Sequence, residues 1–232
     1  MHSRTLRLDA GTLTIDAQSP ELLEDRADEV LGGLALVRDD WRPGFATELA
    51  SWLYSVVPGA ENQHGADGSW QVQALCSARG TETPGVEQHP AVRRWTDDAT
   101  QALAALGGQR AVLERTELKA GAFRVDDVVL VHRELLPRGR TGPMGLYLHR
   151  MREAVRRDDG TTDSGWYLGP VAGAVQPHPS DLAFVPALDL LDEYAFIAPA
   201  LQLPRGCLVL FDDAGIFEVV DADGAERWPR DE

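Results

Sequence analysis

The chain has 232 residues, of which 44% are hydrophobic and 25% are charged, so it can bury a substantial core and is not of the disordered class. Its 22 basic and 37 acidic residues leave a formal charge of −15 at pH 7, which repels phosphate backbones and argues against nucleic acid as a direct partner. No stretch approaches the roughly 20 apolar residues that cross a bilayer. The first residues lack the apolar segment of a signal peptide, so we expect a cytoplasmic protein with no membrane partner.

Cysteine and lysine are both rare in this sequence. Cys76 and Cys207 each lie in an apolar run, where a thiol acts as a small hydrophobe, and no disulfide framework is expected. Lys119 is the single lysine, and this bias towards arginine indicates a GC-rich, bacterial genome.

The first half is predicted to be helix-rich. Alternating apolar residues at 6–16 are typical of a β-hairpin, here with edge-like strands. Apolar residues spaced three and four apart behind a proline start predict helices at 19–31, 43–57 and 90–106, and two of these are expected to end at glycine pairs. Short strands are predicted between these helices at 34–37 and 70–77, and another is predicted after the last helix at 111–118.

The second half is richer in strands. Strands are expected at 127–135, 145–151, 165–168, 182–185, 207–211 and 216–220, with short helices after Pro186 and at 197–203. The predicted fold class is therefore α+β, with a helix-rich N-terminal half and a mainly antiparallel-sheet C-terminal domain that carries one or two short helices. We place the two domains at 1–122 and 123–232. Trp95 and Trp166 are expected in the core, because their neighbours have the period of buried elements.

The motifs with the clearest chemical meaning are absent from this sequence. It has no phosphate-binding glycine loop, no dinucleotide fingerprint, no paired cysteines and no His-Glu-x-x-His, so we assign no catalytic residue, cofactor or metal. Asp212 and Asp213 precede Ala-Gly, which favours a hairpin turn over a metal site. In strands, His132 shares a face with Glu134, and Arg150 with Arg152, and cross-strand ion pairing is the favoured role.

Three segments of the second half resemble a known family. They are 129–134 (Val-Leu-Val-His-Arg-Glu), 145–153 (Gly-Leu-Tyr-Leu-His-Arg-Met-Arg-Glu) and 163–169 (Asp-Ser-Gly-Trp-Tyr-Leu-Gly). Their order and spacing are similar to those of the immunity protein 33 family of bacterial polymorphic toxin systems, in which Asp-Ser-Gly-Trp is the most distinctive motif. The resemblance covers about residues 125–223. The family often has an acid shortly after the last glycine, where this chain has Pro170, Val171 and Ala172.

The resemblance implies a protein that binds and neutralises a cognate toxin without catalysis. The charge of −15 then favours a basic toxin, although acidity that serves only solubility is an equal alternative. The expected partner-binding residues are Arg150, Arg152, Asp163, Ser164, Trp166, Asp212 and Asp213. Two roles are open to the motif at 163–166: turn bonds with a packed indole, or part of a recognition surface.

Two other functions remain open from the sequence. One is an enzyme that binds an anionic small molecule in a cleft between the halves, through Arg150, Arg152 and His149. The other is a regulatory interaction module. The sequence patterns determine neither the oligomeric state nor the toxin.

Overall fold

The computed structural model describes residues 1–9, 11–42, 45–59, 68–76, 94–136, 145–171 and 177–228. The chain divides into two compact units, Met1–Gly107 and Gly108–Glu232, and each has a sheet of its own. The protein is α+β, as its sequence predicts. The division into two independently folding domains at 1–122 and 123–232 remains a prediction. Over the described ranges, no helix has both the length and the apolar character needed to span a membrane.

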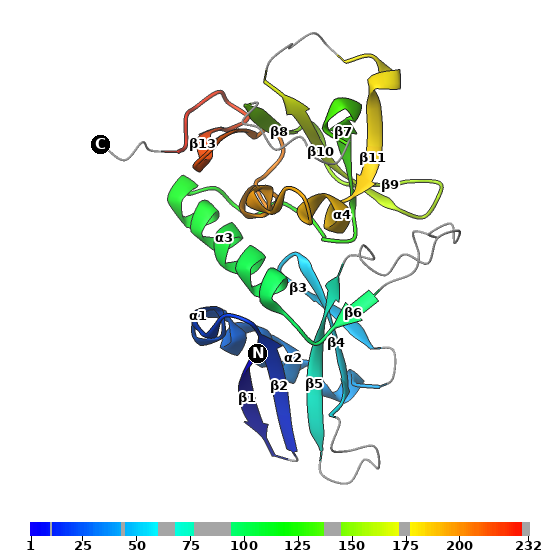
Figure 1. Cartoon of the computed structure of the whole chain (residues 1–232), viewed down its shortest axis with the longest axis vertical. Helices are drawn as coiled ribbons and strands as arrows, with labels where there is room; N and C mark the ends of the chain where they lie inside the picture. Colours follow the sequence, from blue (N-terminus) through cyan, green and yellow to red (C-terminus); the bar gives the residue numbers. More distant parts are fainter. Residues whose placement is uncertain are drawn as a thin grey trace. The chain divides into compact units, whose positions relative to one another are not determined.

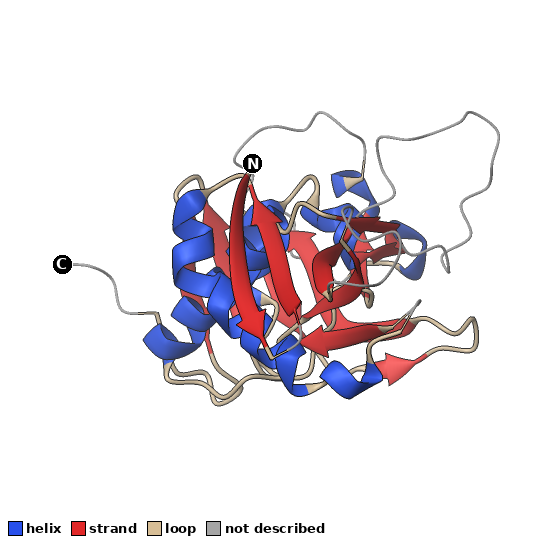
Figure 2. Ribbon diagram, turned by 90° about the horizontal axis from the view of Figure 1, so that it is seen from below, coloured by secondary structure: helices blue, strands red, loops and turns tan. Residues whose placement is uncertain are grey.

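The sheet of the first unit has the strand order β1-β2-β5-β4-β3, and β6 pairs with the end of β5. Its strands are β1 (His2–Leu8), β2 (Gly11–Ala17), β3 (Ala46–Leu49), β4 (Trp52–Pro58), β5 (Ser69–Cys76) and β6 (Arg94–Thr96). The predicted N-terminal hairpin is confirmed as the two long red arrows beside the N label (Figure 2). Of the two hairpin strands, which were both expected at an edge, only β1 is an edge strand, because β2 also pairs in parallel with β5.

One helical stretch packs on the strands of the first unit. It consists of α1 (Pro20–Leu22), a π-helical turn η1 (Leu23–Ala27) and α2 (Asp28–Leu36), and it is followed by the 3₁₀ turn η2 (Arg38–Asp40). As predicted, Ser19 caps its start, with Pro20 in the first turn. Leu23, Ala27, Val30, Leu31 and Leu34 form its buried face. The long helix α3 (Thr100–Thr116) begins where Asp98 accepts hydrogen bonds from the backbone N–H and the hydroxyl of Thr100.

The prediction of a helix-rich first half is wrong. Residues 43–57 do not form a helix; their described part is the β3–β4 hairpin. Trp52, Leu53 and Tyr54 of β4 are at most 4% exposed, so this strand is buried on both faces. A strand of this kind lacks the exposed polar positions that reveal a period of two, and the spacing of its apolar residues also fits a helix. The half-exposed Trp95 of β6 is not a core residue, whereas Trp166 is fully buried, as predicted.

Both glycine pairs that were expected to end helices lie inside them. Helix α2 continues through Gly33 to Leu36, and α3 continues through Gly108 to Thr116, so the strands predicted at 34–37 and 111–118 are absent. A Cβ at Gly33 would lie 2.9 Å from a methyl carbon of Leu49, and a Cβ at Gly108 would lie 2.8 Å from Cγ of Pro199. These glycines therefore permit close packing of a neighbouring element and do not act as helix stops.

The β3–β4 turn holds Ala50 at φ 55°, in the left-handed region. A side chain there costs roughly 1–2 kcal/mol, and glycine relieves this strain at some cost in unfolded-state entropy. We expect Ala50→Gly to raise the free energy of unfolding by about 0.5–1 kcal/mol, measured by urea denaturation. The control Ala35→Gly, in helix α2, should lower it by about 1 kcal/mol. A lower stability of Ala50→Gly would contradict the turn geometry.

The sheet of the second unit has the order β11-β7-β10-β8-β12-β13, and the short β9 pairs with β10 (Figure 1). Its strands are β7 (Val128–His132), β8 (Leu146–Arg150), β9 (Val155–Arg156), β10 (Thr162–Pro170), β11 (Leu182–Pro186), β12 (Leu208–Asp212) and β13 (Gly215–Val220). Helix α4 (Ala187–Leu191) and the 3₁₀ turns η4 (Arg133–Leu135), η5 (Pro179–Asp181) and η6 (Ala195–Ala200) connect them. The predicted final hairpin and the short helix after Pro186 are confirmed.

The sheet of the second unit is mixed: its strand pairs are antiparallel except for β10 and β7, which are parallel. Strand β10 lies between β7, to which it is parallel, and β8, to which it is antiparallel. This central strand is buried on both faces, since Trp166, Tyr167 and Leu168 are all at most 5% exposed. Continuous apolar residues of this kind are typical of a central strand. Trp166 and the buried residues of the neighbouring strands form one face, which we call the inner face; η6 packs on it through Phe196, whose ring is 5.3 Å from that of Phe211.

A loop that follows β13 is held by the carboxylate of Asp221. It accepts hydrogen bonds from the N–H groups of Asp223 and Ala225, at 2.9 Å each, and from Nε of Arg227 at 2.6 Å. The hydrogen bond from Ala225 and the contact with Arg227 hold the pKa of Asp221 below its ordinary value. The charged form therefore stabilises the fold above the unfolded pKa of about 3.9, and this contribution is lost as the pH falls through the lower folded pKa.

We expect Asp221→Asn to be less stable than the wild type at pH 7 and to approach it in stability as the pH falls below about 4. Urea denaturation over pH 2.5–7 would measure this difference. The control Asp213→Asn removes one carboxylate from an exposed turn and should change stability little at pH 7. A difference for Asp221→Asn that stays constant down to pH 2.5 would contradict the assigned role of its charge.

Candidate functional site

The Asp-Ser-Gly-Trp motif forms an irregular stretch at the start of β10. The pairing of β10 with β7 shifts register between Asp163 and Tyr167. Gly165 has φ +79°, and a Cβ built on it would lie 1.9 Å from the carbonyl oxygen of Arg152. Its own carbonyl accepts a hydrogen bond of 2.9 Å from the N–H of Met151. Backbone conformation and close approach together require glycine here.

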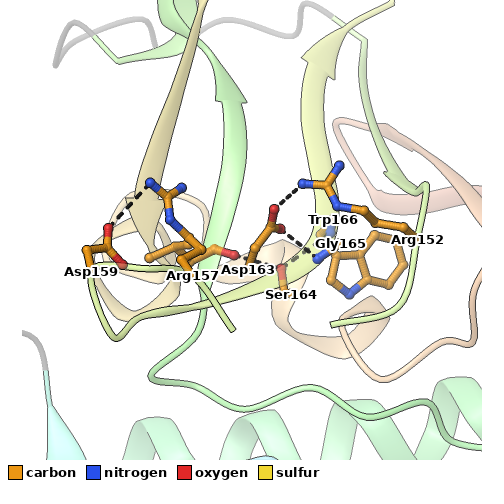
Figure 3. A network of polar contacts seen from close by, with 8 residues as sticks. Arg152, Arg157, Asp159, Asp163, Ser164, Gly165 and Trp166 are labelled. Atoms are coloured by element: carbon orange, nitrogen blue, oxygen red, sulfur yellow. Dashed lines mark hydrogen bonds and ion pairs between the residues drawn. The ribbon is translucent and has the colours of Figure 1, made fainter. Parts of the chain in front are cut away.

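Asp163 and Ser164 use their polar atoms inside the fold (Figure 3). One carboxylate oxygen of Asp163 accepts a 2.9 Å hydrogen bond from the N–H of Gly165, and the other forms an ion pair with Arg152. The hydroxyl of Ser164 donates to the carbonyl of Val128 at 2.9 Å and accepts from the N–H of Trp166 at 3.3 Å. These bonds satisfy the backbone where the sheet register shifts.

Trp166 anchors the motif in the core of the second unit. Its indole has no exposed surface, and its N–H donates a hydrogen bond of 2.9 Å to the carbonyl of Leu201, just after η6. The guanidinium of Arg150 lies 5.6 Å from the centre of the ring system. Trp166 therefore joins the central strand to the segment that covers the inner face.

Arg150 is a fully buried cation that ties two loops to β8. Its guanidinium donates to the carbonyl of Leu203 at 2.7 Å and to that of Ala122. Burial lowers the pKa of Arg150. A Cβ at Gly121 would lie 2.2 Å from the Arg150 guanidinium, so the chain covers this side chain at contact distance. Arg150 thus serves the fold, and its side chain has no surface that a partner can reach.

The remaining arginines near the motif lie at the surface. Arg152 keeps 44% of its side chain exposed while it pairs with the nearly buried Asp163. The guanidinium of Arg157 stacks at 3.8 Å from the ring centre of Phe184 and lies 3.4 Å from a carboxylate oxygen of Asp159. Arg152 is therefore the one residue of the predicted set near the motif that a partner could contact.

Asp212 and Asp213 lie apart from the motif, in the turn between β12 and β13. Both are exposed, and Asp212 accepts a hydrogen bond of 2.8 Å from the N–H of Ala214, which is the turn geometry predicted from the sequence. Of the residues predicted to bind a partner, the structure brings together Arg150, Arg152, Asp163, Ser164 and Trp166. Nδ1 of His132 and Oε1 of Glu134 lie 3.5 Å apart, but Glu134 is in the 3₁₀ turn η4 after β7, so this contact is local and not the expected cross-strand ion pair.

Two tyrosines that the sequence analysis did not single out lie on the sheet face opposite Trp166, which we call the outer face. Tyr147 of β8 and Tyr167 of β10 have ring centres 5.5 Å apart, with their planes at 61°. Burial, followed by the neighbouring Tyr147, raises the pKa of Tyr167, so its phenol is neutral at pH 7. The signal that could have indicated them is the alternation of Tyr147 and His149 with the buried Leu148 and Arg150.

The comparisons with known proteins do not extend this description. No protein-family model matches the chain, and no match was found among curated proteins or among solved structures.

Proposed function

We propose that this chain binds and neutralises a cognate bacterial toxin by forming a stoichiometric complex, as an immunity protein of the immunity protein 33 type. One observation carries the proposal. The three segments of the resemblance, which are separated in sequence, supply β7, β8 and β10, and these are adjacent strands of one sheet. Each residue of the Asp-Ser-Gly-Trp motif makes a contact or adopts a backbone conformation that the irregular start of β10 requires. A resemblance that follows the spatial core of a domain supports a shared fold more strongly than one that is scattered over it.

The charge of the chain supports a cationic partner. At −15, the protein attracts a basic surface over a distance limited by salt, with a Debye length of about 8 Å at physiological ionic strength. We therefore propose a basic toxin domain, whose rate of association with this protein falls as salt is added.

The alternative of an enzyme that binds an anionic small molecule has less support. It requires Arg150, Arg152 and His149 to act together. Arg150 is fully buried with its guanidinium on backbone carbonyls, and His149 is on the opposite face of β8. Only Arg152 of the three could reach such a ligand beside the motif.

Co-expression with the toxin domain encoded next to this chain's gene tests the proposal. We expect the two proteins to co-purify and toxin activity to be abolished near a one-to-one ratio. A toxin domain from an unrelated gene cluster serves as the control and should not be bound. Protection at strongly substoichiometric amounts, with the toxin chemically altered, would show an enzyme instead. Co-purification without loss of toxin activity would favour the regulatory interaction module.

A further inference from the structure

The strand pairings place one row of side chains across the whole outer face of the second sheet. From β11 to β13, each residue pairs with the next, and the row consists of Phe184, Leu130, Tyr167, His149, Leu208 and Val220. All are uncharged at neutral pH, because burial lowers the pKa of His149 below its ordinary value. The row is therefore apolar and aromatic from one edge of the sheet to the other.

This face keeps part of its surface open, in contrast to the inner face. Leu130, His149, Leu208 and Val220 are partly exposed, Phe184 is 42% exposed, and Tyr167 at the centre of the row is only 5% exposed. Their neighbours in sequence, such as Val131 and Leu148, point to the inner face and have no exposed surface. Accessible apolar surface on both sides of Tyr167, on an acidic protein, indicates an interaction surface.

The centre of the face is held in a fixed geometry. Tyr167 and Tyr147 pack edge to face, and the hydroxyl of Tyr167 lies over Gly169, where a Cβ would come within 2.5 Å of it. Gly169, the last residue of the resembling segment, thus makes room for the Tyr167 side chain. Tyr167 is itself nearly buried and holds the partly exposed Tyr147 in place. An ordered tyrosine such as Tyr147 on a rigid strand loses little conformational entropy on binding, which makes it an effective anchor of a protein interface.

The charges beside this centre are acidic. Leu210 lies opposite both Tyr147 and Glu218, so Glu218 is on the same face, one strand beyond Leu210 from the tyrosine pair. At the end of β7, the carboxylate of Glu134 lies 3.5 Å from Nδ1 of His132, whose position in the strand is on the same face as that of Leu130. Arg157, which stacks on Phe184 at the β11 margin, has Asp159 within 3.4 Å. Arg157 therefore places a cation on Phe184, whereas the described positions of β7, β8, β10, β11, β12 and β13 contribute no Lys or Arg to this face.

We infer that the toxin docks on this outer face, covering Tyr147 and Leu210 with apolar side chains and meeting Glu134 and Glu218 with Lys or Arg. This inference rests on the proposed function and names the surface that performs it. It also moves recognition away from the Asp-Ser-Gly-Trp motif, whose side chains are used inside the fold. The motif supports the strand that carries Tyr167 and does not contact the partner.

Charge insertion on the face tests the inference, with the neighbouring-gene toxin domain as the probe. Leu210→Arg places a cation between Tyr147 and Glu218, and we expect it to weaken binding at least 100-fold in calorimetry. The matched control is Leu36→Arg, which makes the same change at an 89% exposed leucine of the first unit and should bind within about twofold of the wild type. Glu218→Lys should lower the association rate more than Glu218→Gln does.

The outcomes separate the inference from the proposed function. If the wild type binds the toxin and Leu210→Arg binds equally well, the outer face is not the docking surface, but the function stands. If the wild type does not bind, both fail. Near-ultraviolet circular dichroism of the aromatic side chains reports whether each variant is folded. If Leu210→Arg is unfolded, Phe184→Arg at a more exposed position replaces it, with a loss of binding expected again. Sedimentation that shows a dimer of the free wild type, lost in Leu210→Arg, would assign the face to a second copy and overturn the inference.

Discussion

Replacing Gly165 by alanine is expected to lower the free energy of unfolding of the second unit by about 4–5 kcal/mol, which is close to the whole stability of many domains. Two costs combine at this residue. At φ +79° any side chain is strained, and the added Cβ would lie 1.9 Å from the carbonyl oxygen of Arg152. A backbone atom cannot move aside as a flexible side chain can, so the strand and the segment beside it would have to separate. Urea denaturation followed by tryptophan fluorescence measures the loss.

Gly160 provides a control that separates these two costs. Its φ is +83°, almost the same as that of Gly165, but the nearest atom to an added Cβ is a guanidinium nitrogen of Arg156 at 4.0 Å. Gly160→Ala should therefore show the conformational cost alone, about 1 kcal/mol. Equal losses for the two variants would mean that the close approach at Gly165 contributes nothing, contrary to the geometry described above.

Trp166→Ala is expected to cost about 3–5 kcal/mol, the range for truncating a large aromatic side chain in a core. The variant removes a fully buried indole and leaves the carbonyl of Leu201 without its 2.9 Å donor. Chemical denaturation at neutral pH measures the change. The variant Trp166→Phe keeps most of the ring packing but loses the N–H donor, and we expect it to cost about 1–3 kcal/mol.

The half-exposed Trp95 of β6 is the natural comparison for Trp166, and Trp95→Ala should be clearly the milder of the two truncations. An unchanged stability of Trp166→Ala would contradict its burial and return the indole to the recognition surface considered from the sequence.

The elements that the sequence indicated correctly are those whose pattern is local. The N-terminal hairpin, β5, α4 and the β12–β13 hairpin each carry their own turn residues, proline start or alternation. The errors occur where partners distant in sequence decide the structure. The two-sided burial of β4 and the close neighbours of Gly33 and Gly108 arise from packing, which no window of the sequence contains.

The candidate site was predicted in part, for the same reason. The sequence indicates the motif at 163–166 but not whether it serves the fold or a recognition surface. That choice depends on whether the Ser164 hydroxyl and the Trp166 indole N–H have partners inside the fold. Those partners, the carbonyls of Val128 and Leu201, are more than 30 residues away in sequence. The outer face was missed because its row joins single residues from six strands. Such a surface exists only once strand order and register are known.

The position of β8 between β10 and β12 has a consequence for synthesis of the chain. Strand β8 leaves the ribosome before both of its neighbours, and its second edge remains unpaired until Leu208–Asp212 has followed. The second unit therefore cannot complete its sheet stepwise, and its nascent form carries an unpaired strand edge from the synthesis of β8 until that of β12. Long-range pairing of this kind slows folding and exposes the chain to association with other chains. The first unit, whose strands are all contained in its own segment, can fold before the second is made.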